Sequence, residues 1–229
     1  MTASLRPRDA ATLILVDRSG PEMRVLMGRR HESHKFMPDK FVFPGGAVDP
    51  EDRRMAAAAP LDESVTEKLL AHTSRRSPAY ARALALAAIR ETFEETGLAL
   101  GVSDLGAPPE PPAGAWTQFA ATGVFPSLEG LDFLARAITP PGRTRRFDAR
   151  FFVADARWIA HRAEGVTHKG AELTELVWVG IEEALRLEIP GITRAVLSDL
   201  AALGPGPHDP KRPRKFYRVL RGKRVVEML

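Results

Sequence analysis

The chain contains no cysteine among its 229 residues. This absence excludes disulfide bonds, thiolate zinc sites and a cysteine nucleophile, so oxygen or imidazole ligands must hold any bound metal. Oxygen ligands favour magnesium or manganese. The sequence also lacks an apolar run approaching the roughly 18 residues that span a bilayer. Residues 1–8 contain no apolar stretch of the signal-peptide type, and we therefore expect a cytoplasmic protein without a membrane partner.

No internal repeat is present, and 44% of the residues are hydrophobic while 27% are charged. These proportions are typical of a soluble globular chain, and the length favours one domain with additions over two. The net charge is +4, and the positive residues gather in three clusters, at Arg24 to Lys35, Arg143 to Arg150 and Lys211 to Arg224. Two interpretations stay open for each cluster: it binds a polyanionic ligand, or it forms solvated loops and edge strands.

Hydrophobic patterns and turn signals divide the chain into predicted elements. We expect strands at 11–16, 24–27, 41–43, 150–154 and 173–179, and a C-terminal hairpin of strands 215–220 and 224–228 around Gly222. Helices are expected at 62–72, 78–96, 116–121, 128–135, 181–187 and 192–203. Helix 78–96 has the clearest ends, because Ser77 and Pro78 provide a cap and a first helical residue while Gly97 provides a stop.

Three carboxylates lie at the end of this predicted helix, at Glu91, Glu94 and Glu95. Each is disfavoured by the negative end of the helix by roughly 0.3 to 1 kcal/mol unless a positive group offsets it. At about 100° per residue the three side chains fall within one arc of roughly 100°, opposite the core-facing Phe93. Arg90 precedes Glu94 by four residues and is within pairing distance. The pattern predicts a helix face that binds a divalent metal, although an acidic face is also typical of plain solvation.

The segment Arg90-Glu-Thr-Phe-Glu-Glu-Thr-Gly97 has five fixed positions in the pattern Arg-Glu-x-x-Glu-Glu-x-Gly. At ordinary residue frequencies of about 6% each, chance produces it on the order of once in several thousand chains of this length. The upstream segment Phe43-Pro-Gly-Gly46 makes coincidence less credible still.

With these motifs the chain resembles the Nudix hydrolases, whose box reads glycine, five residues, glutamate, seven residues, then Arg-Glu-apolar-x-Glu-Glu-x-Gly-apolar. Gly46 fits the opening glycine, and the distal half matches from Arg90 to Leu98. Asp52 stands at the first glutamate position and Thr92 replaces an apolar residue. The third departure is spacing, because 37 residues separate Asp52 from Arg90, an insertion of about 30.

A Nudix subgroup with a long insertion inside the box, which includes peroxisomal coenzyme A diphosphatases, has the same layout. The likeness extends through residues 36–46, 138–143, 146–152 and 178–179 and covers most of residues 9–187. It implies an α/β/α sandwich with a mixed sheet, a helical insertion within the box and a C-terminal helix plus hairpin. We expect a single domain over 1–229, with a core at about 9–187, an insertion at about 53–78 that covers or widens one side of the cleft, and an extension at about 188–229.

The resemblance also implies roles for the box residues. Glu91 and Glu95 are expected to bind the metal directly, with Glu94 as a bridging ligand or an acceptor behind it, and the Gly45 carbonyl as a further ligand. Arg90 is expected to orient a glutamate and to pair with Asp52, and Gly46 and Gly97 shape the loops at either end of the box. The implied cofactor is Mg²⁺ or Mn²⁺.

A further acid outside the box usually serves as metal ligand or general base in this family. Glu172 is our first candidate because it follows the loop 165–171, whereas Glu175 is predicted to lie within a strand. The candidate catalytic set is thus Glu94, Glu95, Glu172 and Arg90. His161 and His168 lie nearby, but a lone loop histidine is more often solvated than catalytic.

The resemblance implies coenzyme A or acyl-coenzyme A as the preferred substrate, cleaved to 3′,5′-ADP and (acyl)phosphopantetheine. Residues 26–46 partly match the second motif of the coenzyme A diphosphatases, and guanidinium groups grip phosphate bidentately. The candidate substrate-binding residues are Arg29, Arg30, Lys35, Arg143 and Arg145. NADH, ADP-ribose and dinucleoside polyphosphates are alternative substrates for the same residues.

Two hypotheses from other classes stay open. The first is a nucleotide-sensing Nudix module without catalysis, which the complete set of acids opposes. The second is an RNA-directed role that uses the basic tail, with Phe216 and Tyr217 stacking on bases. An ordered edge hairpin is the expected alternative for that tail, so we do not expect a nucleic-acid partner. A homodimer is also compatible with the sequence.

Overall fold

The protein was examined as a computed structural model, which describes residues 5–33, 37–74, 77–204 and 212–229. Within these ranges nine strands form one mixed sheet, and two short strands form another. The large sheet contains β1 (Arg8–Asp17), β2 (Arg24–Arg30), β3 (Phe41–Val42), β4 (Gly45–Ala47), β6 (Asp132–Ile138), β7 (Phe147–Asp155), β9 (Leu173–Gly180), β10 (Lys215–Leu220) and β11 (Lys223–Met228). The small sheet pairs β5 (Leu98–Leu100) with β8 (Ile159–Arg162).

The strand order in the large sheet is β11-β10-β6-β7-β1-β2-β3, with β4 paired to β1 and β9 to β2. The β1–β7 and β6–β10 pairs are parallel, and the other pairs are antiparallel. β1 is central because it pairs with β2, β4 and β7. It therefore connects the short strand β4, which carries the first part of the predicted box, to the rest of the sheet.

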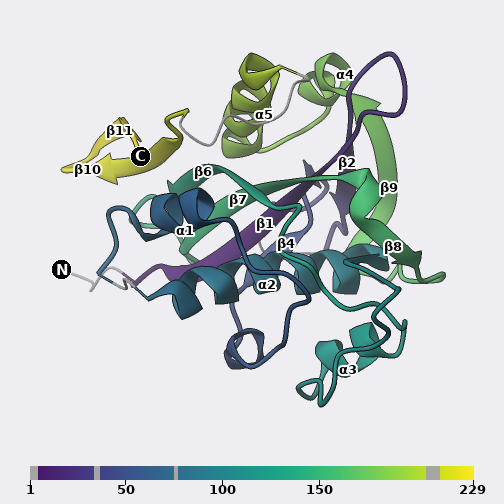
Figure 1. The fold of residues 1–229 in the computed structure, drawn as a ribbon. Helices are drawn as coiled ribbons and strands as arrows, with labels where there is room; N and C mark the ends of the chain where they lie inside the picture. Colours follow the sequence, from purple (N-terminus) through teal and green to yellow (C-terminus); the bar gives the residue numbers. More distant parts are fainter. Residues whose placement is uncertain (1–4, 34–36, 75–76, 205–211) are drawn as a thin grey trace.

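Helices cover both faces of the large sheet (Figure 1). α1 (Glu63–Leu70) and α2 (Pro78–Thr96) cover one face, and α4 (Ile181–Arg186) and α5 (Gly191–Leu203) cover the other. The short helix α3 (Ala115–Ala120) packs against α2 instead. Alternation along β1 divides the core, because Leu13 and Leu15 pack with α2 while Ile14 and Val16 pack with α5. This arrangement confirms the predicted α/β/α sandwich with a mixed sheet.

The boundaries of α2 agree with the predicted helix 78–96. The Ser77 side chain accepts a hydrogen bond from the Tyr80 N–H (3.2 Å), and Pro78 occupies the first turn. Gly97 ends the helix at φ 74°, in the left-handed region that glycine adopts readily, and its N–H donates to the Phe93 carbonyl (2.8 Å). The two signals therefore place the carboxylates in the last turns of α2.

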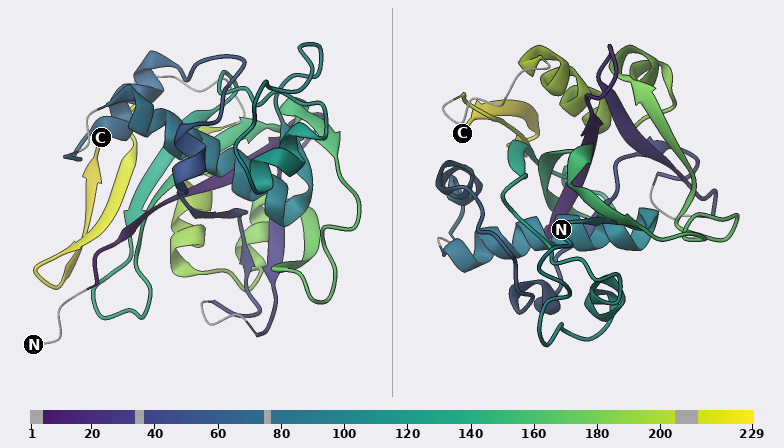
Figure 2. Two further views of the ribbon diagram at one scale, coloured as in Figure 1. Left: turned by 90° about the horizontal axis from the view of Figure 1, so that it is seen from below. Right: turned by 45° about the vertical axis from the view of Figure 1, so that its right-hand side comes forward.

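The insertion begins at the end of the short 3₁₀ helix η1 (Pro50–Arg53), which carries Asp52, and it contains α1. α1 buries Val65 and Leu69 in the core that it shares with α2, as the predicted helix 62–72 requires. Its end meets β6 and the C-terminal segment, because Lys68 donates to the Arg212 carbonyl (3.1 Å) and Arg136 donates to the Ala71 carbonyl (3.2 Å). Figures 1 and 2 show α1 beside the beginning of α2, so the expectation that the insertion borders the cleft is wrong for α1.

The predicted helix at 128–135 is also wrong, because residues 132–138 form β6. β6 lies between β7 and β10 and is covered on both faces, with Phe133 in one core and Leu134 in the other. A strand buried on both faces gives a continuous apolar run, which periodicity alone does not distinguish from a helix. The predicted hairpin of β10 and β11, in contrast, is confirmed.

The two aromatic residues of the hairpin, Phe216 and Tyr217, contact other residues of this protein. Phe216 is buried, with the guanidinium carbons of Arg136 and Arg218 at 4.4 and 5.0 Å from its ring centre. The Tyr217 hydroxyl donates to Asp199. The RNA hypothesis requires both rings to stack on bases, and the buried ring of Phe216 is not accessible for that.

Part of the second basic cluster is structural as well. Arg150 is fully buried, pairs with Asp148 (2.9 Å) and Asp9 (3.3 Å), and donates to the Tyr80 hydroxyl (3.1 Å).

Among the described residues, none of the helices combines the length and apolar character needed to cross a membrane.

Candidate active site

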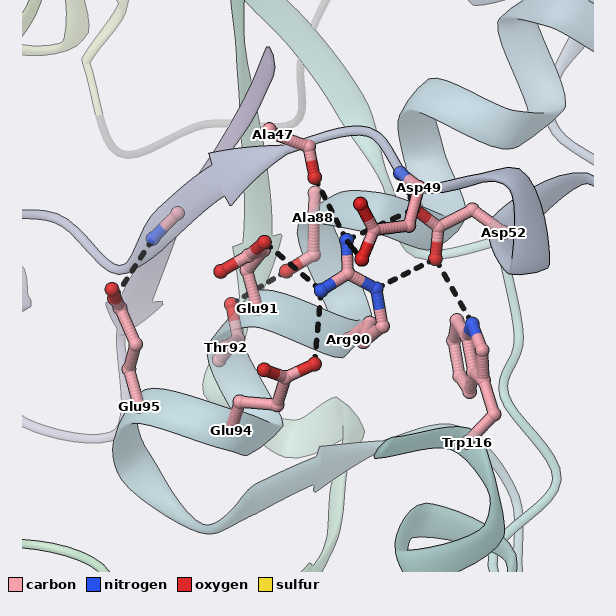
Figure 3. A network of polar contacts seen from close by, with 11 residues as sticks. Ala47, Asp49, Asp52, Ala88, Arg90, Glu91, Thr92, Glu94, Glu95 and Trp116 are labelled. Atoms are coloured by element: carbon pink, nitrogen blue, oxygen red, sulfur yellow. Dashed lines mark hydrogen bonds and ion pairs between the residues drawn. The ribbon is translucent and has the colours of Figure 1, made fainter. Parts of the chain in front are cut away.

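The centre of the site is the guanidinium of Arg90, which is buried on α2 and uses all five of its N–H donors (Figure 3). Nε and Nη2 form a fork onto the Asp52 carboxylate, at 2.7 and 3.0 Å. Nη1 donates to Glu91 and to Glu94, both at 2.9 Å, and the second Nη2 hydrogen is directed at the Ala47 carbonyl (2.8 Å). One side chain thereby ties two acids of α2 to β4 and to the loop that follows it.

Asp52 is the buried partner of this fork. Its Oδ1 accepts from Arg90 and from the Trp116 indole N–H (2.9 Å), and its Oδ2 accepts from Arg90 and from the Asp49 backbone N–H (2.8 Å). The pairing of Asp52 with Arg90 that the sequence suggested is therefore present. The short helix η1 brings the aspartate, which is one methylene shorter than the family's glutamate, close enough to bind.

Two consecutive glycines of β4 lie against the other face of the carboxylate cluster. The Gly45 N–H donates to Glu95 Oε2 at 3.0 Å. A Cβ atom on Gly46 would lie 2.5 Å from the Glu91 carboxylate carbon, and a Cβ on Gly45 would lie 2.5 Å from the Ala11 carbonyl oxygen. Glycine is required at position 45, where a side chain would meet the backbone of β1, whereas a side chain at position 46 would displace the Glu91 carboxylate.

Burial disfavours the ionised forms of two of these acids, Glu91 and Glu95. Burial raises the pKa of Glu91 to about 7, with Arg90 opposing the shift and the charges of Glu94 and Glu172 adding to it. Burial also holds the pKa of Glu95 well above its usual range, and the charges of Glu172 and Glu91 add to that effect. Burial would lower the pKa of Arg90, but hydrogen bonds and charge from Asp52, Glu91 and Glu94 outweigh it, so the net pKa of Arg90 is raised.

Glu172 lies directly before β9 and close enough to Glu91 and Glu95 to raise the pKa of both. Its Oε1 accepts a hydrogen bond from Arg30 Nη2 at 2.6 Å, and its side chain is 45% exposed. Arg30 also acts on Glu95, whose pKa it lowers. The structure thus brings Glu172 and Arg30 to the box carboxylates, whereas Glu175 pairs across the β2–β9 ladder with Arg29.

The other predicted substrate-binding residues that the structure describes, Arg29, Arg143 and Arg145, make no hydrogen bond to the box carboxylates. Arg29 is exposed, and its hydrogen bond to Asp39 (2.8 Å) raises its pKa. Lys35 lies outside the described residues. Arg143 and Arg145 are exposed on the loop between β6 and β7, and Arg145 lines a cavity of about 300 Å³ beside the start of β1. β1 meets β7 there at Arg8 and meets Gly45 at Thr12, so roughly 13 Å of strand separates this loop from the glycines.

The donor atoms at the carboxylate cluster are oxygens, which suits Mg²⁺ or Mn²⁺. Two carboxylates there carry charges that burial disfavours, and a divalent cation would offset both. Across the described ranges no set of three or more acids or histidines is already gathered in metal-binding geometry. Glu91 is instead held by Arg90, and Glu95 by Gly45, so binding an ion requires side-chain rotation within this cluster.

The fold has a clear parallel among solved structures. The crystal structure of a Nudix hydrolase from Alicyclobacillus acidocaldarius is 30% identical to this chain, with a TM-score of 0.66 over 86% of this chain and 92% of that one. The chain belongs to the Nudix hydrolase superfamily. A Caenorhabditis elegans protein named as a nudix hydrolase is 35% identical over 91 residues, which are 40% of this chain and 22% of that protein. No family model matches the chain.

The relationship confirms the predicted enzyme family, whose members generally use divalent metal ions. The structure adds two residues to the polar network around Asp52 that the sequence did not reveal, Asp49 and Trp116. Trp116 lies 64 residues from Asp52 in sequence, and no local pattern connects the two.

Proposed function

We propose that this Nudix protein hydrolyses the diphosphate bond of a nucleoside diphosphate linked to another moiety, with Mg²⁺ or Mn²⁺ as cofactor. The observation that carries the proposal is the pair Glu91 and Glu95, two poorly compensated carboxylates on one face of α2, pressed against Gly45 and Gly46. Charges placed in this way favour a cation.

Glu91 and Glu95 are the proposed direct ligands, with Glu94 as a bridging ligand or an acceptor behind them and the Gly45 carbonyl as a backbone ligand. Bound divalent metal neutralises phosphoryl oxygens and lowers the pKa of a coordinated water. The chain supplies the geometry, because Arg90 holds Glu91 and Glu94 by hydrogen bonds and is itself fixed by Asp52.

Glu172 is the proposed general base, or a further ligand. It is partly exposed, as a group that meets substrate and water must be, and it lies within electrostatic range of Glu91 and Glu95. Arg30 holds its carboxylate and is proposed to bind a substrate phosphate from the same position.

We propose coenzyme A or acyl-coenzyme A as the preferred substrate, yielding 3′,5′-ADP and (acyl)phosphopantetheine. Support comes from the resemblance of residues 26–46 and of the interrupted box to the coenzyme A diphosphatases. Arg143 and Arg145, with Arg29, are proposed to contact the phosphate remote from the cleaved bond, because they lie away from the carboxylates. NADH, ADP-ribose and dinucleoside polyphosphates are the competing substrates.

A substrate screen tests this proposal. Coenzyme A, acyl-coenzyme A, NADH, ADP-ribose and dinucleoside polyphosphates are incubated with the protein and Mg²⁺ or Mn²⁺, and products are identified by mass spectrometry. Wild type is expected to cleave at least one, and Glu95→Gln is expected to lose at least about 100-fold in kcat while retaining its fold. Glu183→Gln, which removes an exposed carboxylate of α4, is the control. Equal turnover by wild type and Glu95→Gln would refute the assigned ligand, and no cleavage of any substrate would refute the reaction.

The cytoplasmic location, the single-domain organisation and the homodimer expected from the sequence remain predictions. Gel filtration with light scattering measures the oligomeric state directly.

A further inference from the structure

Trp116 is the one aromatic side chain that donates a hydrogen bond into the polar network of the site as Figure 3 draws it. Its ring is fully buried, and its indole N–H lies 2.9 Å from Asp52 Oδ1. It comes from α3, a helix outside the Nudix box. We infer that Trp116 is a positioning residue for the metal site, acting through Asp52 and Arg90; this inference rests on the proposed function.

Every acceptor position of Asp52 and every donor of Arg90 is already used in a hydrogen bond. An ionised carboxylate offers about four acceptor positions, and Asp52 fills them with two bonds from Arg90, one from Trp116 and one from the Asp49 N–H. Arg90 in turn uses all five donors. Because Asp52 is 0% exposed, bulk water cannot replace a donor that is removed.

The position of the indole is itself fixed by packing. Trp116 meets Phe119 edge-on with ring centres 5.3 Å apart, and Phe119 meets Phe93 edge-on at 5.2 Å. Phe93 lies on α2, opposite the carboxylate face. The aromatic row therefore anchors α3 to the helix whose acids it helps to orient, so the indole N–H and the acids share one rigid support.

Loss of the N–H would leave one lone pair of a buried carboxylate unpaired, and Asp52 would shift toward its remaining donors. Arg90 would follow Asp52, because the fork between them is bidentate, and the Glu91 and Glu94 carboxylates bonded to Nη1 would move in turn. Partners behind the metal ligands typically affect metal affinity by 10- to 100-fold. The indole acts two hydrogen bonds behind Arg90, through Asp52, so we expect its loss to weaken metal affinity by an amount at the lower end of this range, about tenfold.

Mn²⁺ binding to the full chain without substrate, followed by electron paramagnetic resonance, is the first test. Trp116→Phe keeps an aromatic ring in the row but removes the donor, and it is expected to raise the Mn²⁺ dissociation constant by about tenfold. The matched control is Trp158→Phe, the same exchange at a partly buried tryptophan of η2 (Ala156–Trp158) with no bond to the network. It is expected to bind Mn²⁺ as wild type does.

A second variant removes any ambiguity from altered packing. Replacing Trp116 alone with β-(3-benzothienyl)alanine keeps the bicyclic shape and exchanges N–H for sulfur. It should reproduce the weakened Mn²⁺ binding, and in turnover it should raise the Mg²⁺ concentration for half-maximal rate. Wild-type Mn²⁺ affinity in this variant would overturn the positioning role even if Trp116→Phe were too unstable to measure. Failure of wild type itself to bind Mn²⁺ would instead overturn the proposed function.

Discussion

At the residue scale, the site depends on one guanidinium, that of Arg90, which donates to three acids and to the backbone carbonyl of Ala47. A guanidinium is suited to this task because its donors are rigid, planar and directed at several acceptors at once. Lysine carries the same charge but a single nitrogen. The role of Arg90 is therefore geometric as well as electrostatic.

Arg90→Lys is expected to lower the free energy of unfolding by roughly 2 to 4 kcal/mol, because it leaves the buried Asp52 partly unpaired. It is also expected to reduce kcat by about 100-fold or more, since Glu91 and Glu94 lose their common donor. Urea denaturation and turnover with Mg²⁺ measure the two effects. Arg186→Lys on the exposed pair with Glu182 is the control and should change neither. Retention of half the wild-type kcat by Arg90→Lys would show that charge alone suffices.

At the scale of elements, α2 serves two separate regions of the molecule. Its last turns carry the acids, while its beginning lies beside α1 (Figure 2). α1 is held there by Val65 and Leu69, which are buried in the shared core. The insertion thus contributes stability at one end of α2, whereas η1, which precedes it and carries Asp52, reaches the site.

Leu69→Ala tests this separation of stability from catalysis. The leucine is 1% exposed, and its truncation is expected to cost roughly 2 to 4 kcal/mol of unfolding free energy through lost burial and the remaining cavity. Because α1 makes no bond to the carboxylates, kcat and the Mg²⁺ requirement should stay within about twofold of wild type at a temperature where the variant is folded. A tenfold rise in the Mg²⁺ requirement would mean that α1 helps to shape the site after all.

Local sequence signals predict some of these elements and not others. The ends of α2, the hairpin and the central strands follow from caps, turns and alternating apolar residues, which are local signals. β6 was mistaken for a helix because burial on both faces removes the alternation. The contact of Trp116 with Asp52, and the docking of α1 away from the acids, depend on packing between distant segments and leave no local signal. The carboxylate cluster was visible in advance because three of its acids lie within five consecutive residues.

At the scale of the whole molecule, folding and metal binding are linked through protons. Glu91 has a folded-state pKa of about 7, above the ordinary value near 4.5 that it regains on unfolding. The folded state therefore binds more protons than the unfolded state between these pH values. Without metal, this group stabilises the protein fully at low pH, and its contribution, on the order of 3 kcal/mol, is lost as pH rises through 7.

Mg²⁺ should offset this loss, because the cation favours the ionised carboxylates. The rise in Tm on adding Mg²⁺ to protein pretreated with EDTA is expected to be larger at pH 8 than at pH 5.5. Glu91→Gln should reduce the difference between the two pH values. Equal rises in Tm at both pH values for wild type would argue against metal binding at Glu91.

The central claim is that Glu91 and Glu95 of α2 bind a divalent cation against the Gly45 carbonyl. Anomalous diffraction from crystals soaked in Mn²⁺ tests it most directly. We expect a manganese peak within about 2.0 to 2.6 Å of carboxylate oxygens from both glutamates. A map with no peak there, in which Glu91 still contacts only Arg90 and Glu95 only the Gly45 N–H, would contradict the claim.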